Sequence, residues 1–255
     1  MRRCEVTLLE VRLESGGGSS GRITCPAELR PGPGQYLLAH APGRDDTALT
    51  GVQAALPPYG DNEALPASLF GARGFPLQAD GTPAPGELEL APPLPPGWAA
   101  GTRLVARGPF GRGFNLPAGA RRLGLVGLRP NPYRLLPLAD VALAQGAAVT
   151  LYTRSVPGRL PPEVEVLPLE SLNEALAWAD FLAFDLAPAA LPGLKKRFGL
   201  APHTPMPVPS QALVDVPMPC GGIGECGLCA VAVRRGWRLA CKEGPVFDLN
   251  ELEEA

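Results

Sequence analysis

Four of the six cysteines of this 255-residue chain lie close together near the C-terminus, and their spacing constrains that region more than any other feature of the sequence. They are Cys220, Cys226, Cys229 and Cys241, separated by five, two and eleven residues. A plant-type [2Fe–2S] cluster takes three thiolates from one loop, spaced Cys-x4-Cys-x2-Cys, and a fourth from a distant cysteine. This chain has one extra residue in the first interval, within Gly221-Gly222. We expect these four cysteines to bind a [2Fe–2S] cluster.

The glycines of the same segment support this interpretation. Gly221, Gly222, Gly224 and Gly227 stand between the first three cysteines. A loop that wraps a cluster needs positive φ at several positions and a close approach of backbone N–H groups to sulfur. Two alternatives stay open, namely a zinc site and a thiol cluster without metal. A zinc ribbon usually has two Cys-x-x-Cys pairs, and this sequence has one.

The first part of the chain, residues 1–118, contains short alternating apolar and polar runs separated by turns rich in glycine and proline. Examples are CEVTLLEVRLE, GQYLLAHAP and GTRLVARGPFG. This pattern predicts an antiparallel β-barrel. Cys4 and Cys25 fall within these runs, and we expect them to be small buried hydrophobic residues rather than ligands.

The second part, residues 119–208, alternates between strand-like and helix-like runs. RLGLVGL, AAVTLYT, VEVLPL and DFLAFDL are typical of strands, while YRLLPLADVALAQG predicts an amphipathic helix that ends at Gly146. SLNEALAWA and ALPGLKKRFG predict two further helices. The alternation predicts a small Rossmann-like parallel sheet with helices on its faces. Residues 209–255 then form the cluster domain, so the expected fold is a multidomain α/β protein of three parts.

Composition and charge exclude several functional classes. The net charge is −2, which gives no sign of a nucleic-acid partner. No apolar run reaches the length of about 18 residues that a membrane span needs, and the N-terminus reads as a strand rather than a signal peptide. The two histidines, His40 and His203, form no catalytic constellation with a serine or cysteine. We expect a cytoplasmic protein.

The cluster segment CGGIGECGLCAVAV, followed by ACKEGPVFDLNEL, resembles the C-terminal domain of the electron-transfer subunit of two-component, nicotinamide-linked dihydroorotate dehydrogenases. The resemblance, which lies within the ferredoxin reductase-like superfamily, extends over the chain at PGQYLLAHAP, GPFGRGF and LLPLADVALAQGAAVTLY. In that family, electrons pass between a nicotinamide nucleotide, FAD on the barrel, the [2Fe–2S] cluster and the FMN of a separate catalytic subunit. The resemblance implies a non-catalytic electron-transfer subunit that acts in pyrimidine biosynthesis.

The resemblance also implies a flavin site on the barrel. The family holds FAD with an Arg-Pro-x-Ser segment, and LPASLF matches it with Pro66 and Ser68 but with Leu65 in place of the arginine. That change removes a cation that would pair with the FAD diphosphate. Gly111 and Gly113 belong to GPFGRGF, the segment that resembles the family's barrel-closing glycines.

The nucleotide-binding loop departs from the family pattern. GLRPNPYR, residues 127–134, replaces a glycine-rich phosphate loop, and Pro130 and Pro132 remove two backbone donors. Arg129 and Arg134 are expected to be surface residues, or else to bind phosphate through their side chains. We expect weak NADH and NADPH binding, with electrons exchanged through another carrier such as a ferredoxin-like protein.

Two alternatives to the dihydroorotate dehydrogenase partner stay open. One is a ferredoxin reductase-like or hydrogenase-associated redox subunit built on the same three domains. The other is a non-redox subunit in which a metal site ties down the C-terminus and the nucleotide domain serves for docking.

Overall fold

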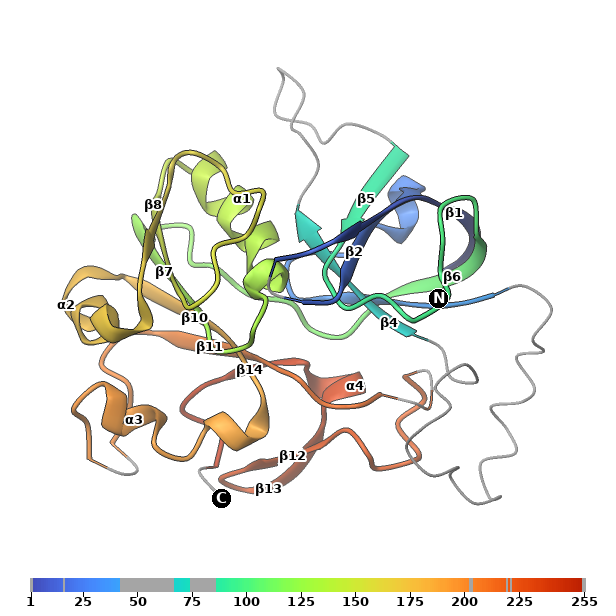
Figure 1. Ribbon diagram of the computed structural model, residues 1–255. Helices are drawn as coiled ribbons and strands as arrows, with labels where there is room; N and C mark the ends of the chain where they lie inside the picture. The colour runs from blue at the N-terminus through green and yellow to red at the C-terminus, as the bar shows by residue number, and fades with distance from the viewer. Residues whose placement is uncertain are drawn as a thin grey trace.

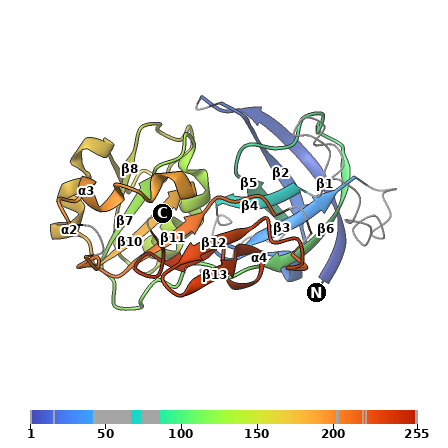
Figure 2. The ribbon, with the colours of Figure 1, turned by 90° about the horizontal axis from the view of Figure 1, so that it is seen from below.

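The computed structural model describes residues 2–15, 17–41, 67–73, 86–201, 204–218, 220 and 222–253. A β-barrel and an α/β sheet lie side by side, and a short hairpin with one helical turn lies below both of them (Figure 1). Seen from below, this C-terminal hairpin runs along the junction between the sheet and the barrel (Figure 2). Among the described residues, no helix has the length and apolar character that crossing a membrane requires.

The structure confirms the antiparallel β-barrel that the alternating pattern of the first part of the chain predicted. Its strands pair antiparallel and close in the order β1-β2-β5-β4-β3-β6. Alternate residues fill the interior, including Leu37 and Leu104, and Cys25 is part of this core with Cys4 packed at its edge. The strands are β1 (Arg2–Leu13), β2 (Ser19–Cys25), β3 (Tyr36–His40), β4 (Ala67–Arg73), β5 (Gly86–Leu90) and β6 (Arg103–Phe110), with the short helix η1 (Ala27–Leu29) after β2.

The second part forms a six-stranded sheet in the order β14-β11-β10-β7-β8-β9. All neighbours are parallel except β14, which runs antiparallel to β11. The strands are β7 (Arg122–Gly127), β8 (Ala148–Thr153), β9 (Val164–Leu167), β10 (Phe181–Leu186), β11 (Ser210–Val214) and β14 (Val246–Asp248). The last two strands come from residues 209–255, so the chain segment assigned to the cluster domain also completes this sheet.

The helix expected at residues 133–146 is present as η4 (Pro132–Leu135) and α1 (Leu136–Ala144), and Gly146 follows it with a φ of 75°. It is not amphipathic, because it packs on the sheet and also on β4 of the barrel. Leu136 joins the core shared with the barrel, whereas Leu138 and Ala142 join the core under the sheet.

The other expected helices are shorter than predicted. Residues 171–179 form the end of η5 (Leu169–Glu174) and α2 (Ala175–Trp178), and residues 190–199 contain only α3 (Leu194–Arg197) after η6 (Pro188–Ala190). Proline at 192 and a left-handed Gly193 separate η6 from α3, since neither favours a continuous helix.

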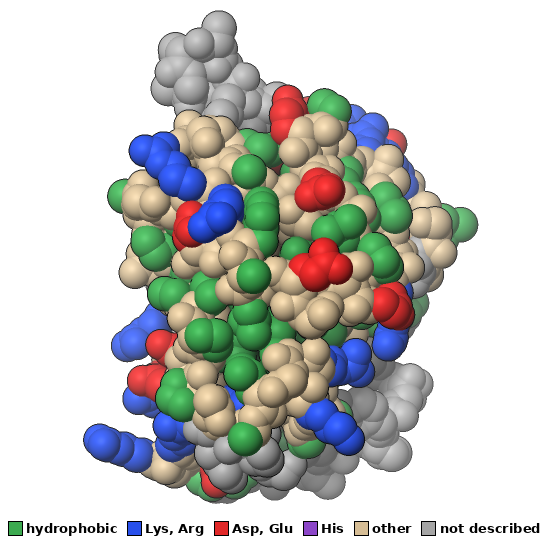
Figure 3. Space-filling view, turned by 90° about the vertical axis from the view of Figure 1, so that its left-hand side faces the viewer, with side chains coloured by type: hydrophobic (Ala, Val, Ile, Leu, Met, Phe, Trp, Pro, Cys, Tyr) green, Lys and Arg blue, Asp and Glu red, His purple; other side chains and the backbone are tan. Residues whose placement is uncertain are grey.

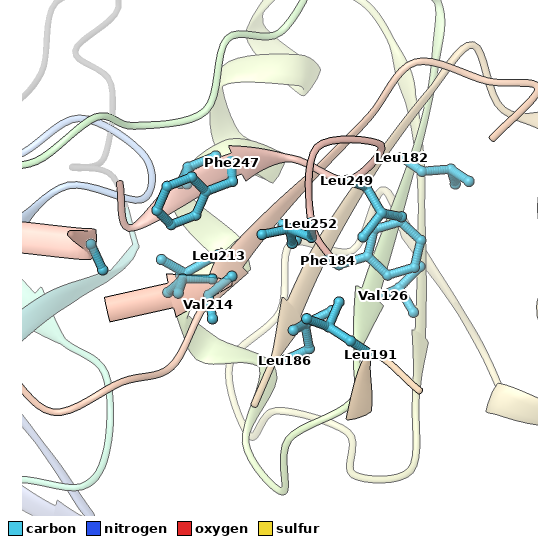
Figure 4. Packing of buried hydrophobic residues seen from close by; sticks show 14 of the residues in the cluster. Val126, Leu182, Phe184, Leu186, Leu191, Leu213, Val214, Phe247, Leu249 and Leu252 are labelled. Atoms are coloured by element: carbon cyan, nitrogen blue, oxygen red, sulfur yellow. The ribbon is translucent and has the colours of Figure 1, made fainter. Parts of the chain in front are cut away.

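One large core joins the three parts of the chain. It contains Tyr36 and Phe70 from the outer face of the barrel, Phe184 from the sheet, and three of the cluster cysteines. Figure 4 shows Leu249 and Leu252, which follow β14, packed over β10. The face of the molecule shown in Figure 3 carries charges of both signs around a band of apolar side chains, without a large patch of one sign.

Candidate metal centre

The loop that carries Cys220, Cys226 and Cys229, here called the cluster loop, connects the sheet to a small hairpin. It follows β11 and leads directly into β12 (Ala230–Val233), which pairs with β13 (Gly236–Leu239), and β13 continues into α4 (Ala240–Glu243). Because Ala230 is paired with Leu239, the hairpin brings the residues just outside it together. The N–H of Ala240 donates to the carbonyl oxygen of Cys229 at 3.0 Å. The hairpin therefore carries the distant Cys241 back to the loop.

The predicted positive φ angles are confirmed at three glycines. Gly222, Gly224 and Gly227 have φ values of 81°, 79° and 73°, while Gly221 lies outside the described residues. Gly222 lies against the barrel, where an added Cβ would stand 3.4 Å from Phe110 Cδ1. At Gly224 an added Cβ would stand 2.4 Å from Lys242 Cε. The loop thus needs glycine for conformation and for close packing.

The four predicted thiols come together in one chain of contacts. Cys226 donates a hydrogen bond to Cys220, and Cys241 is hydrogen-bonded to Cys229 and Cys220. Cys220, Cys229 and Cys241 are buried and Cys226 is partly exposed, and all four are free thiols. No group of three or more His, Cys, Asp or Glu side chains within the described ranges is arranged around a single metal ion. Four linked thiols supply the number of ligands that a binuclear [2Fe–2S] centre takes, two for each iron.

Backbone amides of the loop point at the sulfur atoms. Burial alone would raise the pKa of Cys220, but hydrogen bonds from Gly224, Cys226 and Glu225 outweigh it and lower that pKa to about 7. Burial and the neighbouring thiols raise the pKa of Cys241 to about 12. Amides that favour a thiolate would also stabilise the negative charge on cluster sulfur, so the residues fit an iron–sulfur cluster.

Tyr36 joins the barrel to the metal centre, a contact that the sequence did not indicate. Its hydroxyl lies 3.5 Å from the carbonyl oxygen of Cys241. Its ring stacks on Phe110 and tilts against Phe70, with centroid distances of 5.6 and 5.7 Å. Burial and the nearby cysteines raise the pKa of Tyr36, so the hydroxyl stays protonated. The aromatic group fills the space between β4 and the cluster loop.

The predicted flavin residues are only partly described. Pro66 lies outside the described residues, and Ser68 stands on β4 paired with Leu38 of β3. Gly111 has a φ of 75°, and an added Cβ there would lie 2.6 Å from the Gly244 carbonyl oxygen. At Gly113 an added Cβ would lie 2.4 Å from the Pro33 carbonyl oxygen. Both glycines permit close backbone packing, and their contact with a flavin stays a prediction.

A buried ion-pair network occupies the carboxyl end of the parallel sheet. Arg134 is 4% exposed and binds the Asp185 carboxylate through Nε at 3.0 Å and through Nη2. Its Nη1 donates to Asp215 Oδ1 at 2.9 Å, and Arg129 Nη1 reaches the same oxygen at 2.8 Å. The guanidinium also lies 4.8 Å from the Phe70 ring centroid. Burial opposes the charge of Arg134, but Asp185 and Asp215 outweigh it and raise its pKa.

The structure therefore corrects both expectations for Arg134, which is neither a surface residue nor available to a phosphate. The loop before Arg134 also packs closely against other parts of the chain. Pro132 packs on Gly127, where an added Cβ would lie 2.6 Å from the proline Cβ. Asn131 Nδ2 donates to the Gly17 carbonyl oxygen at 2.7 Å, and the Tyr133 hydroxyl binds the Glu14 carboxylate. These contacts fasten the loop to the β1–β2 turn.

Comparison with known proteins agrees with this geometry. Residues 217–253 match the family model of the iron–sulfur cluster binding domain of dihydroorotate dehydrogenase B. This segment contains all four thiols of the metal centre. A search of curated proteins found no match.

Solved structures match the chain as a whole. An NADH-dependent reduced ferredoxin-NADP oxidoreductase, described in work on flavin-based electron bifurcation, aligns with a TM-score of 0.69 at 16% identity, over 97% of this chain and 89% of that one. Phthalate dioxygenase reductase, described as a modular structure for electron transfer from pyridine nucleotides to [2Fe–2S], aligns with a TM-score of 0.56 at 13% identity, over 91% and 87%. The chain has the ferredoxin reductase-like fold, as the order of its parts predicted.

Proposed function

We propose that this chain is the electron-transfer subunit of a dihydroorotate dehydrogenase, with a [2Fe–2S] cluster on Cys220, Cys226, Cys229 and Cys241 and FAD on the barrel. When bound, an iron–sulfur cluster accepts and releases single electrons. The observation that carries the proposal is the convergence of these four thiols within the segment that matches the dihydroorotate dehydrogenase B domain. Dihydroorotate chemistry, and thus the step in pyrimidine biosynthesis, would belong to the FMN-containing partner.

The surface near the metal centre supports docking of that partner. Ile223 and Leu228 of the cluster loop are exposed, and Trp237 on β13 is 72% exposed. Exposed aromatic residues are frequent anchors of protein interfaces. Docking on this face would place the partner's flavin near the cysteines, since Leu228 is next to Cys229 in the chain.

The barrel supports the flavin part of the proposal. Both solved structures described above are reductases that share this fold, one described in work on flavin-based electron bifurcation and the other as a structure for electron transfer from pyridine nucleotides. On this chain, the outer barrel residues Tyr36 and Phe70 lie between β4 and the metal centre. A flavin bound on that face would lie close to the cluster loop.

The test of the cofactors is anaerobic purification followed by iron, sulfide and flavin analysis. We expect about two iron atoms and two labile sulfides per chain, and a rhombic paramagnetic signal after reduction. Stoichiometric zinc without sulfide would contradict the proposal and favour the metal-stabilised docking subunit.

The test of the partner is co-expression with the dihydroorotate dehydrogenase catalytic subunit of the same organism. We expect a complex that survives gel filtration and is weakened by Trp237→Ser. Leu13→Ser is a matched control, because Leu13 is an exposed apolar residue at the end of β1 rather than on the hairpin. An intact cluster with no complex at micromolar concentration would favour a ferredoxin reductase-like subunit with another partner.

A further inference from the structure

Arg107, on the outer face of the barrel strand β6, is a buried arginine with two unpaired donors. It is 9% exposed, and its Nε and Nη2 atoms are buried and have no hydrogen-bond partner in the described part of the chain. A buried guanidinium with unsatisfied donors destabilises a protein unless a ligand completes it. The side chain therefore has the character of an anion-binding group.

The unpaired atoms define the geometry of the missing ligand. Nε and Nη2 lie on one edge of the guanidinium and donate in parallel, which suits two oxygens of a carboxylate or phosphate. Arg134 uses the same two atoms to bind Asp185. In Arg107 the two donors of that edge are buried and unpaired, so an anion with two acceptor oxygens would satisfy both.

The surroundings of Arg107 favour an anionic ligand from outside the chain. Its register partner on β1 is Arg3, which adds a second cation rather than a carboxylate. Its register partner on β3 is Leu38, and Leu38 packs in the core shared with Phe70 and Tyr36. Arg107 thus lies beside the face of the barrel that meets the other two parts of the chain.

The position relative to β4 identifies the anion. Leu38 pairs with Arg107 on one side and with Ser68 on the other, so Arg107 is two strands, or about 10 Å, from the predicted flavin segment. That segment has Leu65 where the resemblance implies an arginine for the flavin diphosphate. Resting on the proposed function, we propose that Arg107 binds the diphosphate of FAD and supplies the guanidinium that position 65 lacks.

The test compares FAD with riboflavin, which has the same ring system but no diphosphate. Flavin fluorescence quenching is measured with the full chain, with Arg107→Met and with Arg107→Lys. We expect Arg107→Met to weaken FAD binding about 10–100-fold, because charge-assisted hydrogen bonds are lost, and to leave riboflavin binding unchanged. Arg107→Lys keeps the charge but loses the two-donor edge, so it should fall between the two.

Arg103→Met is the matched control, since Arg103 is an exposed residue four positions earlier on the same strand and the same face. It should bind FAD like the native chain. Thermal unfolding without flavin is a second readout. Arg107→Met should melt no lower than the native chain, because it removes an unpaired buried charge.

Equal FAD affinity in Arg107→Met, parallel loss of FAD and riboflavin, or no preference of the native chain for FAD would each overturn the proposal. Iron and sulfide analysis of the same samples separates this result from the proposed function. A full cluster without FAD preference overturns the diphosphate site at Arg107 and leaves the cluster function standing. FAD preference that depends on Arg107 in a protein unable to bind a cluster overturns the cluster function and supports this site.

Discussion

The guanidinium of Arg134 is buried against the carboxylate of Asp185, at the carboxyl end of β10 where an open α/β sheet normally binds its ligands. Asp185 is fully buried and Arg134 is 4% exposed. Asp215, which follows β11 on the way to the cluster loop, and Phe70 of the barrel complete the contacts of Arg134. This arginine therefore touches all three parts of the chain.

The first prediction is that NADH and NADPH bind no tighter than about millimolar. Two prolines remove amide donors, each worth about 1.5–3 kcal/mol, so affinity should fall by roughly two to four powers of ten. Entry of a phosphate would also have to break the Arg134–Asp185 pair. Stopped-flow reduction of the anaerobic protein by NADH measures this, with dithionite as the control that the cluster is reducible. Rapid bleaching with micromolar half-saturation would contradict the prediction.

The second prediction concerns Arg134→Met, which leaves Asp185 charged, buried and unpaired. Breaking a buried pair in this way costs about 3–5 kcal/mol, so the denaturation midpoint should fall strongly. Arg122→Met is the matched control, because Arg122 forms an exposed pair with Asp180 at 2.8 Å and its loss should change the midpoint little. Equal midpoints for the two variants would show that the network does not stabilise the fold. The measurement is urea denaturation followed by far-UV circular dichroism.

The sequence predicted the architecture through apolar patterns, and such a pattern is clear only where one face of a strand or helix is buried and the other is exposed. Alternation in CEVTLLEVRLE was sufficient for β1, because Val6 and Leu8 face the barrel interior while Glu5 is exposed. The prediction of an amphipathic helix was wrong for α1, because contacts from the sheet and from β4 bury most of it. An amphipathic pattern forms only when one side meets water, and the sequence does not say which domain covers the other side.

The grouping of the four thiols was predictable because it follows from local spacing, whereas the network around Arg134 joins residues far apart in the chain. One feature of the sequence did indicate a buried ion pair. Asp185 stands inside the apolar run FLAFDL, and a carboxylate in a buried strand requires a partner. Nothing in the sequence distinguished Arg134 from Arg129 as that partner. Tyr36 carried no signal, because its contact with Cys241 spans 205 residues.

The third prediction tests the ligand set by substitution. Cys226→Ser and Cys229→Ser should each abolish cluster absorbance and lower iron and sulfide content, because four cysteine ligands hold a [2Fe–2S] cluster. Cys4→Ser and Cys25→Ser should keep the cluster, since both residues belong to the barrel core. Loss of the cluster in Cys25→Ser with the fold intact would mean that the ligands are assigned wrongly. The measurement is visible absorbance with iron and sulfide analysis of protein purified anaerobically.

The last prediction concerns the contact between the barrel and the segment that carries Cys241. Gly111→Ala places a methyl group 2.6 Å from both Gly244 O and Pro245 Cδ, at a φ of 75° that alanine disfavours. Gly101→Ala is the matched control, because Gly101 has a φ of 88° but no atom within 4 Å of the added Cβ. Both variants lose about 1 kcal/mol to backbone strain, and Gly111→Ala should lose about 1–3 kcal/mol more through overpacking. Because the displaced residues follow α4 directly, Gly111→Ala should also lower cluster retention during gel filtration while Gly101→Ala retains it. Equal unfolding midpoints and equal iron content for the two variants would show that Gly111 does not hold the C-terminal segment against the barrel.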